Sequence, residues 1–418
     1  MKFTDIGFER KWKILLLSCL FILCVGSSLV FSQTDASIFQ FFTINDMYYG
    51  GRSVAMGCTA NALGYDVASS RSNPGNLINI PKNIAEVDIS YNTYNRTVYD
   101  DEFSFSSTTP AFFGMALNYG SISFSFFQEK MFKMEETFYS LGRQLPLEFN
   151  APGLNTQRNI DLTTRGFNVA LLLTGDLAIG IGFRRGDLKL QANSYRDALF
   201  VETGYDTVNS SIDINDDDSA WSFGVLLQPR GDFRIGAAYH LGLSYSIIET
   251  RSYFESQNTI KAETLEYQFN TPRSLKLGAA LDFKRLMLAF DYSLIYYSDI
   301  LKDGMKILDI TVDGNAFTAK NSKELHLGVE FPLTIGKTNV LFLRGGMQYL
   351  PFKGIHYTGS SGNSVLDEIL KAMYPENDAK IGMSFGSGIN LKQAVFIDVG
   401  FMMSSTRKDM VITGGYNF

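Results

Sequence analysis

From about residue 84 onward, apolar residues alternate with small or polar residues at a period of two. In 394–403, for example, Val395, Ile397 and Val399 share one face of an extended chain, and Asp398 lies on the other. This period is typical of β-strands whose two faces meet different surroundings. The pattern predicts fourteen strands, at about 84–93, 103–118, 121–130, 159–173, 177–190, 219–228, 233–250, 273–283, 286–297, 322–333, 338–349, 379–390, 394–403 and 408–418.

After the first connection, short turns alternate with long loops. An even number of strands, with short turns at one end and long loops at the other, is typical of a transmembrane β-barrel. Such a barrel pairs every backbone polar group without leaving an edge. A soluble β-protein also alternates, but it has no reason to alternate its loop lengths. We therefore predict an all-β fold over 84–418, a 14-stranded antiparallel transmembrane β-barrel, with long loops at 131–158, 191–218, 251–272, 298–321 and 350–378.

The first 32 residues have the composition of a secretory signal peptide. Basic residues precede a short apolar run, and Val30 and Ser32 suit the positions before a cleavage site. An uncleaved membrane anchor is the alternative, but the run is short and is interrupted by Ser, Cys and Gly. We expect residues 1–32 to be removed and the mature chain to begin at Gln33.

Charge and motif content exclude several function classes. The chain has 37 basic and 43 acidic residues, a net charge of −6, and no basic cluster, so we expect no nucleic-acid partner. His240, His326 and His356 lack the spacing of metal ligands, and the acidic run 213–218 lacks the Gly and Glu of an EF-hand. No catalytic or phosphate-binding motif occurs. We expect no enzyme activity, no cofactor and no metal site.

Residues 33–83 precede the first predicted strand and do not alternate. A barrel of fourteen strands is too wide for its own side chains to fill, so something must close it. This segment carries aromatic residues, such as Phe39 and Tyr48, that are unfavourable in water. We predict that 33–83 is a plug, or hatch, inside the lumen; a mobile periplasmic tail is the alternative.

The hatch sequence resembles that of a known family. Residues 50–57 read G-G-R-S-V-A-M-G; Asp66, Ala68 and Ser69 follow, and then 73–77 read N-P-G-N-L. This order and spacing resemble the N-terminal hatch of the FadL family, outer-membrane transporters of long-chain fatty acids and other hydrophobic compounds. Gly75 stands where the family usually has Ala.

The resemblance implies a function and a location. It implies an outer-membrane protein that takes up hydrophobic small molecules, such as long-chain fatty acids, by passive lateral diffusion. It also implies that the hatch motif Asn73, Pro74 and Gly75 lies at a gap in the barrel wall. We expect the apolar outer face to contact outer-membrane lipid. The terminal Phe418, with Tyr416 before it, resembles the signal read by the barrel assembly machinery.

Two sets of residues are candidates for ligand contact. The first set consists of basic residues on inward strand faces, which could meet a ligand carboxylate or instead pair with inward acidic residues: Arg184, Arg234, Lys276 and Arg344. The second set follows helical spacing in the last long loop, where it could form an outer apolar groove or simply pack over the rim: Val365, Leu366, Ile369, Leu370 and Met373.

Two other functions remain open at this point. A similar barrel and a similar G-G-R-S-V-A-M-G opening suit PorV-like proteins, which bind secreted cargo proteins. A porin for polar solutes is the third possibility. Salt current through the protein would indicate the porin, and co-purification with secreted proteins would indicate the PorV-like function.

Overall fold

The computed structural model describes the chain from residue 50 onward, with gaps. The undescribed positions after residue 49 are 81, 99–100, 141–142, 145–149, 152–153, 197–207, 229–231, 257–258, 284, 302–305, 308–309, 312–315, 352–353, 360–366, 369–370, 372–373, 375 and 377. The predicted signal peptide, residues 33–49 of the predicted hatch and the five residues of the predicted outer groove lie outside the described residues.

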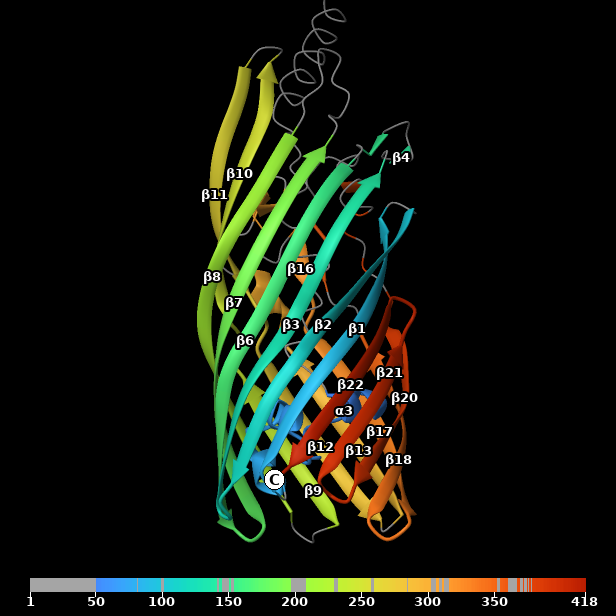
Figure 1. Cartoon of the computed structure of the whole chain (residues 1–418). Helices are drawn as coiled ribbons and strands as arrows, with labels where there is room; N and C mark the ends of the chain where they lie inside the picture. Colours follow the sequence, from blue (N-terminus) through green and yellow to red (C-terminus); the bar gives the residue numbers. More distant parts are fainter. Residues whose placement is uncertain are drawn as a thin grey trace, which may run out of the picture.

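Sixteen strand segments form one antiparallel sheet in the described part of the chain (Figure 1). They are β1 (Ile84–Val98), β2 (Asp101–Asn118), β3 (Ile122–Ser140), β6 (Leu154–Thr174), β7 (Leu177–Arg196), β8 (Val208–Leu227), β9 (Phe233–His240), β10 (Ser244–Ser256), β11 (Thr259–Asn270), β12 (Ser274–Phe283), β13 (Leu286–Ile295), β17 (Ser322–Ile335), β18 (Asn339–Leu350), β20 (Lys380–Leu391), β21 (Val395–Met403) and β22 (Arg407–Asn417).

The sheet closes into a barrel. β1 pairs with β22, and β8 pairs with β9 at its lower end and with β10 at its upper end. Because β10 continues β9, and β11 leads into β12, the segments make fourteen barrel strands among the described residues. The predicted 14-stranded antiparallel barrel is confirmed, and every predicted strand has a counterpart.

Short elements complete the described structure. Three lie inside the ring before β1: the helices α3 (Gly51–Ala55) and α4 (Val67–Ser72) and the 3₁₀-helix η1 (Pro74–Asn79). The remainder belong to the connections: β4 (Arg143–Gln144), β5 (Asn150–Ala151), η3 (Tyr297–Leu301), β14 (Lys306–Ile307), β15 (Ile310–Thr311), β16 (Phe317–Ala319) and β19 (Ile355–Tyr357). No helix among the described residues is long and apolar enough to cross a membrane.

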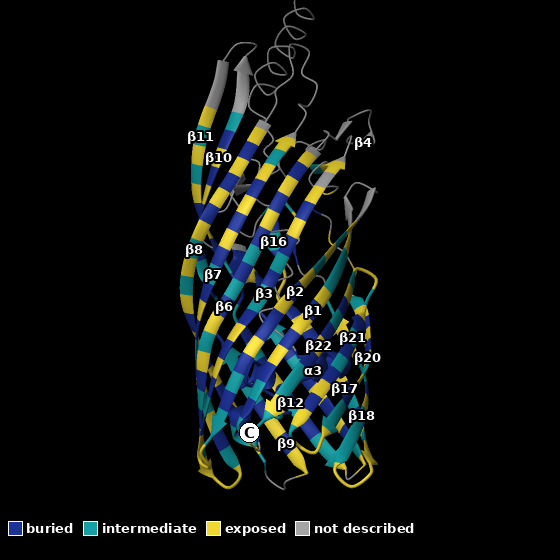
Figure 2. Ribbon diagram, in the orientation of Figure 1, coloured by how far each residue is buried: buried dark blue, intermediate teal, exposed yellow. Residues whose placement is uncertain are grey.

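An apolar band surrounds the outside of the barrel. Along each strand, buried and exposed residues alternate, as Figure 2 shows for β6, β7 and β8. The exposed positions of the band carry large apolar side chains, which is the pattern expected of a wall in contact with lipid. They include Val87, Ile89, Phe113, Phe126, Phe167, Ile179, Ile181, Phe223, Leu277, Phe290, Leu327, Phe331, Leu343, Met383, Phe385, Ile397 and Ile412.

Above this band, the prediction of long loops at 131–158, 191–218 and 251–272 is wrong. β3, β6, β7, β8, β10 and β11 continue through most of these residues and rise above β17–β22 (Figure 1). The alternation changes phase there: in β7, Ile181 and Phe183 face outward, but Leu188 and Leu190 face inward and are fully buried. The extension therefore has a polar outside and a largely apolar inside, in which the charged side chains Glu136, Arg158, Glu249 and Arg251 are also buried.

Candidate functional site

Residues 50–80, which we call the hatch segment, lie inside the barrel and are almost entirely buried (Figure 1). The sequence explains its local structure. Asp66 precedes α4, and its carboxylate accepts the Ser69 N–H at 2.6 Å, as an N-cap residue does. Asn73 Oδ1 accepts the Gly75 N–H at 2.9 Å, and Pro74 occupies the first position of η1, where no N–H is needed.

Polar contacts join the hatch segment to strands on all sides of the barrel. The acceptors are inward-facing side chains of the wall, and they belong to strands β22, β20, β13, β1 and β3. The pairs are Gly51 N with Thr413 Oγ1 (2.8 Å), Gly57 N with Ser384 Oγ (2.7 Å), Ala60 N and Asn61 N with Asp291 Oδ2 (2.8 and 2.9 Å), Val67 N with Glu86 Oε2 (2.8 Å), and Arg71 Nε with Glu129 Oε1 (2.7 Å).

A buried ion-pair network holds the first turn of the hatch segment. The Arg52 guanidinium donates two hydrogen bonds to Glu330, at 2.9 and 2.8 Å. Arg344 Nε donates to the same carboxylate at 2.6 Å, and Arg344 also pairs with Asp398. All four side chains are at most one-tenth exposed. Removing one member would leave buried charge without a partner, so the network favours the seated position of α3.

Inward-facing glycines make room for the hatch segment. A Cβ at Gly180 of β7 or Gly224 of β8 would overlap residues 73–75, and one at Gly236 of β9 would overlap Asn61. On the opposite side, a Cβ at Gly328 of β17 or Gly346 of β18 would overlap residues 56–57. The wall and the hatch segment therefore touch backbone to backbone, which larger residues would prevent.

The motif Asn73, Pro74 and Gly75 lies against β7, β8 and β9, which form a continuous ladder at that level. Asn73 Nδ2 donates to the carbonyls of Asn61 and Val225, both at 2.9 Å. The expectation that this motif lies at a gap in the wall is therefore corrected. The motif lies against hydrogen-bonded strands, and Gly180 and Gly224 make its close approach possible.

The ladder is interrupted elsewhere, between β2 and β3. In the described residues, their pairing ends at Phe112 and Glu129, although both strands continue upward. At this level the β1–β2 register skips Ala111, beside Pro110, which has no N–H to offer. We call this interruption the β2–β3 separation; it begins at the outer edge of the apolar band.

The four predicted ligand-contact bases do not gather at one place. Arg234 lies near the lower end of β9 and donates to the Tyr65 hydroxyl at 2.6 Å, and Arg344 belongs to the Glu330 network. Arg184 donates to the Leu241 carbonyl at 2.8 Å. Arg184 and Lys276 both lie close enough to His240 to act on it electrostatically.

His240 marks the upper side of the hatch segment. Its Nε2 lies 2.9 Å from the Ser72 carbonyl, and Arg71 is the third cation near it. Its Nδ1 is buried and has no hydrogen-bond partner among the described residues. Of the predicted contacts, Arg184 and Lys276 are therefore the pair that the fold brings together.

Above this level, the lumen is filled by apolar side chains, which we call the upper lumen cluster. Its members come from β3, β6, β7, β8, β10, β11, β13, the link between β9 and β10, and the connections beyond β13: Phe132, Met134, Ile160, Leu162, Leu188, Leu190, Ala192, Ile212, Ile214, Ala220, Leu243, Tyr245, Ile247, Tyr267, Phe269, Ile295, Tyr297, Ile300, Phe317, Ala319, Ile355, Tyr357 and Tyr374.

Aromatic residues from the connections cover this cluster. The Phe317 ring of β16 packs against Tyr357 of β19 and against Tyr374, with centroids 5.2 and 5.3 Å apart. Beside them Lys320 donates to Glu376 at 2.6 Å, which lowers the pKa of that exposed carboxyl. Phe317, Tyr357 and Tyr374 are themselves buried, so these rings shield part of the lumen from water.

Neither a comparison with protein-family profiles nor one with curated proteins finds a match. Solved structures do match. A Pseudomonas aeruginosa FadL homologue aligns over 89% of this chain and 99% of its own, with 12% identity and a TM-score of 0.69. The P. putida toluene transporter TodX aligns over 90% and 99%, with 14% identity and a TM-score of 0.66. The Ralstonia pickettii toluene transporter TbuX aligns over 90% and 99%, with 13% identity and a TM-score of 0.64.

Proposed function

We propose that this chain, which has the fold of the FadL homologue and the toluene transporters, is a bacterial outer-membrane protein that admits hydrophobic small molecules. The fold and the apolar outer band support the location. The residues before β1 would act as its hatch.

The observation that carries this proposal is the upper lumen cluster. A porin for polar solutes has a polar lumen filled with water. Here the inward positions above the hatch segment carry Leu162, Leu188 and Leu190, all fully buried. Apolar burial gives roughly 25 cal/mol per Å², so such an interior favours hydrophobic ligands over polar ones.

The ligand would leave the lumen sideways. The β2–β3 separation is the proposed exit, because β2–β3 pairing ends there, and Phe112 and Phe127 stack beside it with centroids 6.4 Å apart. We propose that small movements of the hatch segment and of these rings open this route, with transport down the concentration gradient.

Long-chain fatty acids are the ligand class that we propose first. A fatty acid has an apolar chain for the upper lumen cluster and a carboxylate for Arg184 and Lys276 beside His240. Assembly would use the last strand, in which Tyr416 and Phe418 are exposed and stacked, as the signal for the assembly machinery.

Uptake by cells tests this proposal. Cells lacking the chain, and the same cells carrying wild type or Asn73→Ala, would be given labelled oleic acid or labelled toluene. We expect wild type to restore uptake of at least one label. Asn73→Ala, which removes the contacts to Asn61 and Val225, should restore less. Unchanged uptake of both labels on deletion would contradict the proposal.

A further inference from the structure

An aromatic row marks the upper edge of the apolar band on one side of the barrel. Phe167 of β6, Phe183 of β7 and Trp221 of β8 face outward on neighbouring strands. Their ring centroids lie 5.7 and 5.0 Å apart. Aromatic residues at this position mark the depth of lipid headgroups in barrel walls.

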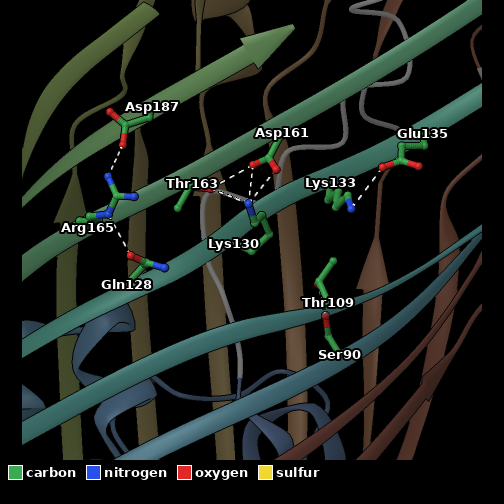
Figure 3. A network of polar contacts seen from close by, with 10 residues as sticks. All are labelled: Ser90, Thr109, Gln128, Lys130, Lys133, Glu135, Asp161, Thr163, Arg165 and Asp187. Atoms are coloured by element: carbon green, nitrogen blue, oxygen red, sulfur yellow. Dashed lines mark hydrogen bonds and ion pairs between the residues drawn. The ribbon is translucent and has the colours of Figure 1, made fainter. Parts of the chain in front are cut away.

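Directly above this row, the same outward positions become charged. The side chains, which we call the charged belt, are Lys130, Asp161, Arg165, Arg185, Asp187, Lys189 and Asp217. Arg165 and Arg185 are the next outward residues after Phe167 and Phe183. Figure 3 shows part of the belt across β3, β6 and β7, with Lys130 against Asp161 and Arg165 against Asp187.

The belt forms a hollow rather than a flat face. It surrounds a cavity of about 530 Å³ that also contacts Gln128, Thr163, Asn215 and Asp216. Because the wall continues here as paired strands, these groups keep a fixed position directly above the aromatic row, whereas side chains on loops would not. The hollow is large enough for a sugar or phosphate group.

The ion pairs of the belt can exchange partners. Arg165 lies 2.6 Å from Asp187, and Arg185 lies 2.8 Å from Asp217, yet both guanidiniums are more than half exposed, at 61% and 58%. Exposed pairs of this kind add little stability. A phosphate can therefore replace the carboxylate at the guanidinium fork, and the released carboxylate can share a divalent cation with a neighbouring phosphate.

We propose that the charged belt binds the phosphorylated headgroup of an outer-leaflet lipid. Arg165 and Arg185 bind phosphate, the carboxylates bind bridging divalent cations, and Phe167, Phe183 and Trp221 contact the acyl chains below. Elsewhere on the barrel, Lys323 of β17 and Lys408 of β22 are exposed lysines near the upper ends of their strands and lie outside the belt. This inference rests on the proposed outer-membrane location.

Native mass spectrometry of the detergent-solubilised full chain tests the belt. The protein would be mixed with bis-phosphorylated lipid A, with dephosphorylated lipid A, or with bis-phosphorylated lipid A plus excess inorganic phosphate. We expect wild type to retain only the phosphorylated lipid. Arg165→Gln/Arg185→Gln should retain roughly tenfold less, the effect of losing a charge-assisted contact.

The matched control is Lys323→Gln/Lys408→Gln, which removes the same charge from exposed positions on β17 and β22, outside the belt. We expect it to behave as wild type. Equal retention of dephosphorylated lipid, equal losses in both double variants, or complete displacement by inorganic phosphate would each overturn the lipid site. Uptake of oleic acid and toluene by cells that carry these variants separates the two proposals. Absence of uptake would contradict the transport function, but it would not change the lipid retention measured by mass spectrometry.

Discussion

At the scale of single residues, Glu330 is the wall carboxylate that binds Arg52 of the hatch segment. It accepts hydrogen bonds from Arg52 of the hatch segment and from Arg344 of the wall. The inward acidic residues of the strands therefore serve the hatch segment. For Arg344, the alternative of internal ion pairing that the sequence left open is the one that the structure adopts.

We expect Glu330→Gln to loosen the hatch segment. The substitution leaves two buried guanidiniums to share Asp398, and breaking a buried pair in this way costs about 3 kcal/mol. Planar-bilayer recordings of the purified protein should show more frequent current steps than wild type. Lys323→Gln, on the same strand but exposed, is the control and should show no more current steps than wild type. Equal current from both variants would contradict the anchoring role.

Gly224 gives a second test at this scale. Gly224→Val would drive a side chain into Asn73 and Pro74, whereas Gly414→Val, where nothing lies within 4 Å of the new Cβ, should be neutral. We expect the first variant to release residues 73–75 to protease added from the periplasmic side of opened vesicles. Equal cleavage of both variants would show that this close approach does not hold the motif.

The hatch motif could be recognised from the sequence, but its position could not. Asn73, Pro74 and Gly75 stand out by their order, yet nothing local indicates which strands they meet. The glycines opposite them, Gly180 and Gly224, are 105 residues or more away along the chain, and their role depends on strand register. Pro110, read as an ordinary strand residue, could have been noticed because proline is rare inside paired strands.

At the scale of elements, the alternation of apolar and polar residues predicted every barrel strand. Within the apolar band, the outward positions face lipid and are apolar, and the inward positions are small or polar, so each strand shows the same pattern. It did not predict the upper ends of β3, β6, β7 and β8. There water lies outside and apolar side chains lie inside, so the phase reverses near Gly186 and residues such as 212–217 resemble a polar loop. A search for strands with apolar residues on either face would have found these extensions.

The β2–β3 separation is the element on which lateral exit depends. Pro110→Val combined with deletion of Ala111 removes the two irregularities of β2 and should let the β2–β3 ladder extend upward. We expect oleic acid uptake to fall severalfold while the barrel still shows heat-modifiable mobility in gels. Uptake equal to wild type, with a folded barrel, would exclude this route.

At the scale of the whole molecule, the barrel combines a seated hatch segment with an apolar chamber above it. The seated hatch segment predicts little passage of ions, and the upper lumen cluster predicts selective passage of hydrophobic molecules. Solved structures with the same fold include a FadL homologue and toluene transporters.

The most direct test of the central claim places one polar group in the upper lumen cluster. Ile160 is fully buried there, and Asn159 beside it faces outward. An unpartnered polar group in such a place costs about 1–3 kcal/mol. We predict that Ile160→Asn lowers oleic acid and toluene uptake about tenfold per folded barrel, whereas Asn159→Asp leaves it unchanged. Equal uptake by Ile160→Asn and wild type would contradict passage through this chamber.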